Sequence, residues 1–238
     1  MSKYTFYFGE ESLNWAGYVV SSNFSNPEPE VTDIDGSWIV QSVKPTMFPT
    51  YSAQWIGIGG FFSGDKSLIQ TGTLSYSEFG QTYYCAWYEI LPAAATPIQN
   101  FTVKPGDTIY SSIILLKVIN STTQEWKITL DDVTEHEYFS ITLNYSSSLL
   151  SGEWIEERPE VFGHLSTLAD FGIAYYGEGY TNIALTNYVT IDGTIGPIGA
   201  FPYESITMTN DIGEPIAVPG NLLYNGTSFN ITYEGLIR

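Results

Sequence analysis

The sequence predicts an all-β fold, a two-sheet antiparallel β-sandwich, and three observations support this prediction. Aromatic residues make up 16% of the chain, which also holds 18 Tyr, 22 Gly and 12 Pro. These are the residues that half-buried pleated surfaces and tight turns use. Short runs of β-branched and aromatic residues with period-2 alternation recur between turn motifs, and no segment has a sustained helical period. Such a sandwich has a concave face that can form a groove for an extended ligand.

Nine runs are predicted to be strands because each combines alternation with flanking turn residues. The first follows "NPEPE", the second follows "KPTMFP", and the run after "KPGD" begins at residue 108. The segment "KVINSTTQEWKITL" predicts a hairpin that turns around residues 120–123. In chain order the predicted strands span residues 36–42, 55–58, 67–74, 82–90, 108–119, 125–130, 138–144, 153–157 and 171–176.

We expect residues 1–238 to form a single domain. A chain of 238 residues can bury a substantial core, and β-sandwiches of this length are commonly one domain. No internal repeat, low-complexity tract or linker divides the sequence.

The charge balance indicates adaptation to acid. The formal net charge is −18 at pH 7, although only 14% of residues are charged, against about 25% in an average domain. Below a pH of about 4 most carboxylates are neutral, which leaves at most the 8 Lys and Arg and 2 His as charges. We therefore expect a fold that persists at pH 3 and weakens towards neutrality, because like charges then accumulate. The same acidity argues against nucleic acid and anionic membrane as partners.

Cysteine and glycosylation signals bear on the compartment. The single cysteine, Cys85, excludes an internal disulfide and a cysteine-rich metal site. N-glycosylation sequons begin at Asn23, Asn100, Asn120, Asn144, Asn225 and Asn230, which favours a secreted glycoprotein. The start of the chain has no apolar run of signal-peptide length, and no later run is long enough for a membrane span.

Conventional catalytic sets are not supported by the sequence. His136 and His164 are the only histidines, and neither lies in the context of a serine hydrolase. The acidic clusters "DIDG", "DDVTEHE" and "TIDG" lack the alternating ligand loop of a calcium site. An aspartic peptidase needs two Asp-Thr-Gly or Asp-Ser-Gly turns, whereas this chain has Gln70-Thr71-Gly72 in place of such a turn.

Three stretches place one long polar side chain in an aromatic, strand-like setting. They are "SLIQTG" with Gln70, "AWYEILP" with Trp87 and Glu89, and "SGEWIEERPE" with Glu153. With four further blocks, "NWAGYVV", "SAQWIGIGG", "LADFG" and the segment from Ile206 to Tyr233, the sequence resembles the glutamic peptidases, or eqolisins. Fungal members carry disulfides that this chain cannot form, so it is similar to the prokaryotic type.

The resemblance implies a jelly-roll sandwich like that of legume lectins, with a Gln and a Glu facing the concave groove. These match Gln70 and Glu153. Glu153 would act as general base and then as general acid, which requires that its pKa not be strongly raised. Gln70 would hold the attacking water and stabilise the oxyanion. Trp55, Trp87 and Glu89 match residues that line the groove.

The expected function is therefore an acid-acting endopeptidase on polypeptide substrates, secreted, monomeric, and without a metal or cofactor. Alternation places Glu153, Ile155 and Glu157 on one face of their strand and Trp154 and Glu156 on the other. Two alternatives remain open. One is a glycoside hydrolase that uses two carboxylates among Glu89, Glu153, Glu156 and Glu157. The other is a lectin-like carbohydrate-binding module whose Trp residues stack on sugar.

Overall fold

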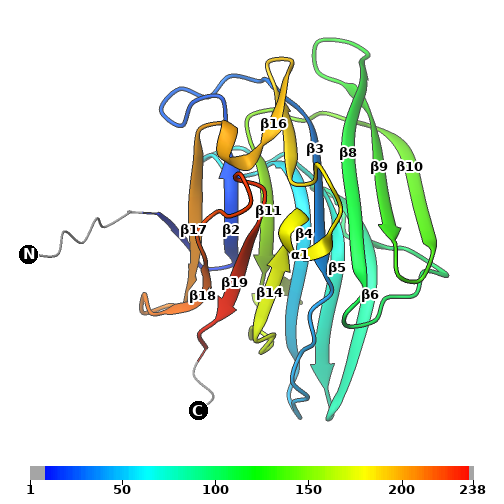
Figure 1. Cartoon of the computed structure of the whole chain (residues 1–238), viewed down its shortest axis with the longest axis vertical. Coiled ribbons are helices and arrows are strands. Elements are labelled where there is room, and N and C mark those ends of the chain that lie inside the picture. The colour runs from blue at the N-terminus through cyan, green and yellow to red at the C-terminus, as the bar shows by residue number, and fades with distance from the viewer. Residues whose placement is uncertain (1–8, 236–238) are drawn as a thin grey trace, which may run out of the picture.

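The structure is a computed structural model that describes residues 9–235. Hydrogen-bonded pairings join seventeen of its strands into one continuous sheet, which folds over into two packed layers. The strands run mainly along the long axis of the molecule (Figure 1). Between the named strands of this described part, all pairings are antiparallel except that of β1 with β17.

The first layer carries the candidate catalytic residues. Its strands lie in the order β1 (Glu10–Ser12), β17 (Tyr203–Thr209), β2 (Trp15–Val20), β11 (Gly152–Glu157), β4 (Thr50–Gly59), β5 (Leu68–Glu78), β6 (Gln81–Ile90) and β7 (Thr96–Pro97).

The second layer packs against one face of the first. Its strands lie in the order β18 (Pro215–Pro219), β19 (Phe229–Tyr233), β14 (Ile173–Tyr176), β3 (Val31–Ile39), β8 (Thr108–Val118), β9 (Gln124–Asp132) and β10 (Glu137–Tyr145). The hairpin of β15 (Tyr188–Ile191) and β16 (Thr194–Pro197) pairs with the first half of β3. Outside both layers lie the ribbon of β12 (Glu160–Val161) and β13 (His164–Leu165), helix α1 (Glu178–Thr181) and a 3₁₀ turn at Ile198–Ala200.

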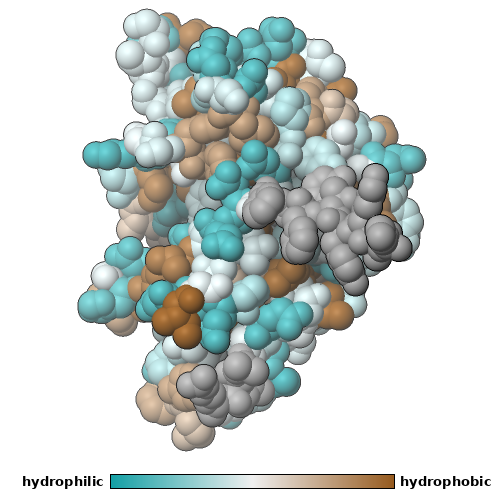
Figure 2. Space-filling view, turned by 90° about the vertical axis from the view of Figure 1, so that its left-hand side faces the viewer, coloured by the Kyte–Doolittle hydropathy of each residue, from teal (hydrophilic) through white to brown (hydrophobic). Residues whose placement is uncertain are grey.

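One edge connects the two layers, because β17 pairs with β18 and β18 continues into the second layer through β19. This edge lies on the left of Figure 1 and faces the viewer in Figure 2. Hydrophilic and hydrophobic residues are interspersed over it (Figure 2). The pairing of β17 with β18 thus closes the sandwich on this side.

The core lies between the layers and is rich in aromatic side chains. Trp38, Trp154 and Tyr176 are fully buried there. The indole of Trp154 donates to the carbonyl of Asp35 at 2.7 Å, and the indole of Trp38 donates to Thr73 Oγ1 at 3.0 Å. Buried Trp N–H groups need such acceptors, and both bonds connect one layer to the other.

The all-β antiparallel prediction is confirmed, and every predicted run falls on an observed strand. The predicted turn at 120–123 is also present, closed by the bond from the amide of Ile119 to the carbonyl of Thr123. The sequence did not predict β2 or the strands from β15 to β19. β2, β16 and β18 contain Gly or Pro, and β15 and β19 are short, so alternation alone could not identify them. β17 has seven residues without Gly or Pro, and the alternation in its "SITMT" was a signal that could have identified it.

Candidate active site

Glu153, Gln70 and Glu89 lie in one row across the first layer, on the face turned away from the second layer. Glu153 on β11 is opposite Gly57 on β4, Gly57 is opposite Gln70 on β5, and Gln70 is opposite Glu89 on β6. Directly opposite residues direct their side chains to the same face. Two inter-strand spacings, about 9.6 Å, therefore separate the Cα atoms of Glu153 and Gln70. The strand between them contributes no side chain to this row.

Gly57 was not predicted as part of the site, and its lack of a side chain shapes the space between the two candidates. A Cβ at this position would lie 2.7 Å from Trp55 Cζ3 and 3.0 Å from Leu68 Cδ1. The indole ring and the leucine side chain thus lie over the glycine. In "WIGIGG", Trp55, Gly57 and Gly59 alternate along one face of the strand. This alternation was the signal that could have indicated a position without a side chain between Glu153 and Gln70.

Trp55 is buried and fixes a second carboxylate of the same face. Its indole Nε1 donates to Glu157 Oε2 at 2.7 Å, and its ring meets Trp15 edge-on with centroids 5.0 Å apart. Asn14 Nδ2 donates to the other oxygen of Glu157 at 3.3 Å. Burial raises the pKa of Glu157 to about 7, and the Trp55 N–H opposes this rise. The predicted contact of Trp55 with substrate stays a prediction, because in this structure its side chain is fully covered.

Gln70 is held by Glu89. The Gln70 side-chain amide donates to Glu89 Oε1 at 2.8 Å, while Gln70 Oε1 is buried without a partner. Burial raises the pKa of Glu89, and the bond from Gln70 opposes this rise. An amide nitrogen has two N–H groups, so one N–H and the carbonyl oxygen of Gln70 remain for a water molecule or a reacting group.

Glu153 is fully buried, and neither of its carboxylate oxygens has a hydrogen-bond partner. Burial therefore raises the pKa of Glu153 well above its ordinary value, although the nearby Ser151 hydroxyl opposes this rise. The mechanism requires that this pKa not be strongly raised, and the structure departs from this requirement. Apolar side chains cause the difference, since Val19, Trp55 and Leu68 form a hydrophobic cluster on this face, with Phe24 and Phe61 packed against it.

Glu156 points to the other face, as alternation predicts. Its carboxylate accepts hydrogen bonds from the Ser52 hydroxyl and, at 3.0 Å, from the Tyr176 hydroxyl. Burial between the layers raises the pKa of Glu156 to about 8. Glu156 therefore cannot form a catalytic pair with Glu153, which removes one of the carboxylates that the glycosidase hypothesis offered.

Two cavities flank Glu153 on the open face of the first layer. The first, which we call the cleft, has a volume of about 530 Å³ and is lined by Gln70, Trp87, Glu89 and Glu157 among others. The second has a volume of about 710 Å³ and is lined by Phe24, Phe61, Glu10 and Glu204 among others. Asn14 and Trp15 line both cavities, whereas Glu153 lines neither. Glu153 is thus buried and opens to neither cavity.

The remaining sequence candidates lie outside this site. His136 and His164 are exposed. Within residues 9–235, no group of three or more His, Cys, Asp and Glu side chains is arranged to hold a metal ion. No helix in this part of the chain is long and apolar enough to cross a membrane.

Comparison with protein families and known sequences gives two findings. The sequence profile of the Peptidase A4 family matches residues 13–210. Aspergillopepsin-2 from Aspergillus niger is 28% identical in an alignment 240 residues long, which covers 94% of this chain and 78% of that protein.

Comparison with solved structures shows the same fold. Scytalido-glutamic peptidase bound to a transition state analog inhibitor matches with a TM-score of 0.72 and 19% identity, over 93% of this chain and 98% of that one. SCP-B, an eqolisin in complex with the tripeptide Ala-Ile-His, matches with a TM-score of 0.68 and 18% identity over the same shares. Aspergilloglutamic peptidase from Aspergillus niger matches with a TM-score of 0.61 and 24% identity, over 77% of this chain and 99% of that one.

Proposed function

Because the chain belongs to the Peptidase A4 family, we propose that Glu153 and Gln70 are the catalytic pair with which it hydrolyses peptide bonds. The protein is a glutamic endopeptidase that acts in acid. The proposal concerns which residues carry out this reaction and how they divide its steps.

The observation that supports this pair most strongly is the set of unsatisfied polar atoms in one row. Both oxygens of Glu153 and the side-chain oxygen of Gln70 are buried without partners. Buried polar atoms usually have hydrogen-bond partners, and leaving one unpaired costs about 1–3 kcal/mol. A water molecule between the two side chains would donate one hydrogen bond to a Glu153 oxygen and the other to the Gln70 oxygen, and this water is the nucleophile that the reaction needs.

In the proposed mechanism Glu153 acts first as a base and then as an acid. As a carboxylate it takes a proton from the water while the water oxygen attacks the scissile carbonyl carbon. The carbonyl oxygen becomes an oxyanion, to which the free N–H of Gln70 donates. Glu153 then passes its proton to the leaving amine as the carbon–nitrogen bond breaks. A neutral amide keeps its donor at every pH, which suits an enzyme that works in acid.

The raised pKa of Glu153 sets a condition on this mechanism. A dry, unpaired carboxyl group binds its proton tightly, so Glu153 must gain water or substrate donors before it can ionise in acid. Substrate that displaces the side chains covering Glu153 would admit this water. The polar donors thus arrive together with the peptide.

Glu89, Trp87 and Glu157 line the cleft beside Gln70, and we propose that they contact the polypeptide substrate. Glu89 also orients the Gln70 amide, because it accepts one of its N–H groups. Residues 1–238 act as a single domain and as a monomer. The enzyme is secreted into an acidic environment, like the acid peptidases of its family, and its single cysteine is in keeping with a prokaryotic-type member.

Digestion of a denatured protein substrate between pH 2 and 7 tests the proposal. Wild type, Glu153→Gln and Gln70→Ala are compared with pepstatin present, which silences contaminating aspartic peptidases. Wild type should cut in acid, and both variants should lose nearly all activity. If Glu153→Gln cuts as well as wild type, the catalytic pair is misplaced.

A further inference from the structure

Three stacked tyrosines form a row on the same face of the first layer as Gln70. Tyr51, Tyr76 and Tyr83 are directly opposite one another on β4, β5 and β6. The rings of Tyr51 and Tyr76 stack with centroids 5.5 Å apart and planes 19° apart, and those of Tyr76 and Tyr83 with centroids 4.9 Å apart and planes 21° apart. We call this row the tyrosine shelf.

The cleft leads from Gln70 to the tyrosine shelf. Its lining includes Gln70 at one end, Leu74 and Cys85 in the middle, and Tyr51 at the other end. Gln70 and Tyr76 are six residues apart on β5, so their side chains share a face. Six residues of extended strand span about 20 Å.

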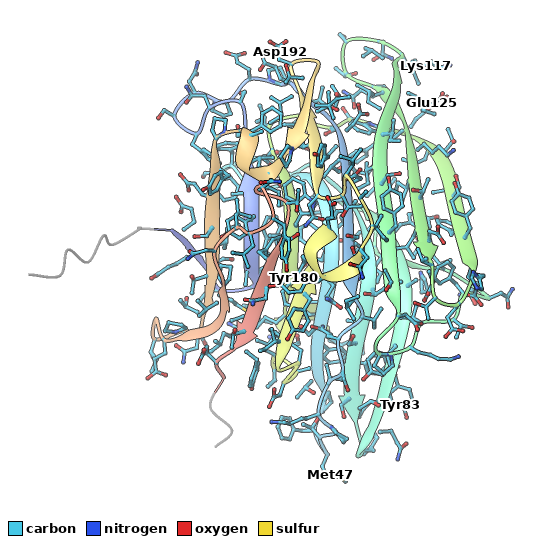
Figure 3. The ribbon with its side chains drawn as sticks, in the orientation of Figure 1. Met47, Tyr83, Lys117, Glu125, Tyr180 and Asp192 are labelled. Atoms are coloured by element: carbon cyan, nitrogen blue, oxygen red, sulfur yellow. The ribbon has the colours of Figure 1, made fainter. Side chains whose placement is uncertain are left out.

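The outer end of the shelf is open. Tyr83 is 45% exposed, and β6 is an edge strand at this position because β7 pairs only with Trp87 and Tyr88. In Figure 3 the side chains of Tyr83 and Met47 lie at the same end of the molecule. The outer ring therefore has room for a further aromatic or aliphatic group.

Exposed apolar residues surround this end. Met47, Phe48 and Phe79 are 71%, 59% and 72% exposed. The amide of Phe79 donates to the carbonyl of Met47 at 3.2 Å, which holds the turn after β5 against the loop before β4. Exposed apolar groups that gather on one surface often mark an interaction site.

We propose that the tyrosine shelf is a distal substrate subsite, which binds an aromatic or aliphatic side chain about six residues from the scissile bond. The inference rests on the proposed function, because the scissile bond is placed at Gln70 and Glu153. An extended peptide has nearly the same rise per residue as the strands beneath it. In a peptide that runs along β5, a side chain six residues from the bond reaches the shelf. Unfolded polypeptides expose such apolar residues, whereas folded proteins bury most of them.

Two pairs of internally quenched peptides with one common scissile core test the subsite. In the first pair Phe or Gly lies six residues before the scissile bond, and in the second pair six residues after it. The kcat/KM of each peptide is measured for wild type, Tyr83→Ala and Tyr83→Phe. Tyr138→Ala is the matched control, since Tyr138 is an exposed tyrosine on β10 of the second layer.

In one of the two pairs, the Phe peptide should be cut about three- to tenfold better than the Gly peptide, in line with the energy of one aromatic pair. This ratio should persist in Tyr83→Phe and Tyr138→Ala and fall to about one in Tyr83→Ala. All four enzymes should cut the short core peptide equally. A ratio near one for wild type in both pairs, or an unchanged ratio in Tyr83→Ala, would overturn the proposal.

Binding separates this proposal from the proposed catalytic pair. The same peptides are titrated into Glu153→Gln and into Glu153→Gln combined with Tyr83→Ala, and Kd is measured without cleavage. Tighter binding of the Phe peptide that depends on Tyr83 supports the shelf even if the catalytic pair is wrong. Equal Kd values for the Phe and Gly peptides overturn the shelf even if the pair is right.

Discussion

Replacement of Glu156 by Gln should flatten the dependence of stability on pH. Glu156 is buried between the layers, where Ser52 and Tyr176 donate to its carboxylate. Burial raises its pKa to about 8 in the folded protein, against an ordinary value of 4.5. The folded state thus binds the proton more tightly than the unfolded state. The stability from this proton is fully present below pH 4.5 and is lost as the pH rises through 8.

The size of the effect follows from the shift of about 3.5 units between those two pKa values. At about 1.36 kcal/mol per unit, wild type should lose about 5 kcal/mol of unfolding free energy from this group between pH 4 and pH 9. About 3 kcal/mol of that should be gone by pH 7. Glutamine has nearly the same shape and cannot ionise, so Glu156→Gln should keep most of this stability.

Urea unfolding at intervals between pH 3 and pH 8 measures the difference. The control is Asp192→Asn, which removes one acidic charge from an exposed turn. The φ of Asp192 is 49°, and Asn adopts this left-handed conformation as well, so the substitution should not strain the backbone. Glu156→Gln should lose about 3 kcal/mol less than wild type between pH 4 and pH 7, while Asp192→Asn should follow wild type closely. If the curves of Glu156→Gln and wild type run parallel, the buried proton on Glu156 does not govern pH stability.

Three further substitutions test the site. Glu89→Ala should lower kcat about tenfold, because Gln70 loses the acceptor that orients it; steady-state kinetics on one peptide in acid measures this. Gly57→Ala should cost about 1–3 kcal/mol of unfolding free energy, since its Cβ would lie 2.7 Å from Trp55 Cζ3; urea unfolding at pH 4 measures the loss. Trp55→Phe should cost about 1–3 kcal/mol, because Glu157 loses its N–H donor at 2.7 Å; the same unfolding assay applies.

Matched variants control for these changes. Glu89→Gln keeps a side-chain acceptor and should retain most of the kcat that Glu89→Ala loses. Equal losses of kcat in Glu89→Gln and Glu89→Ala would contradict the orienting role of Glu89. Gly152→Ala places a Cβ on β11 whose nearest atoms lie at 3.4 Å, so it should be milder than Gly57→Ala. A Trp55→Phe variant as stable as wild type would show that the bond to Glu157 adds nothing to the fold.

Local alternation predicted the faces of the site correctly. It placed Glu153 and Glu157 on one side of their strand and Glu156 on the other, and the register confirms this arrangement. Alternation depends only on neighbouring residues in one strand. The sequence alone therefore contained the information for this part of the site.

The surroundings of the two glutamates could not be predicted in this way. Gly57 lies between Glu153 and Gln70 because β4 separates β11 from β5, and strand order is a long-range property of the fold. The Ser52 partner of Glu156 is 104 residues away in the chain. The apolar side chains that cover Glu153 likewise come from five parts of the sequence. A local sequence pattern therefore could not predict the burial that raises the pKa of Glu153.

The most direct test of the central claim is a double-mutant comparison of kcat/KM on one peptide at pH 4. Wild type, Glu153→Gln, Gln70→Ala and the double variant are assayed after a check that each is folded. If the two side chains act on one water molecule, each single variant should lose most of the activity, and the double variant should be little worse than Glu153→Gln alone. Activity close to that of wild type in Glu153→Gln would contradict the account.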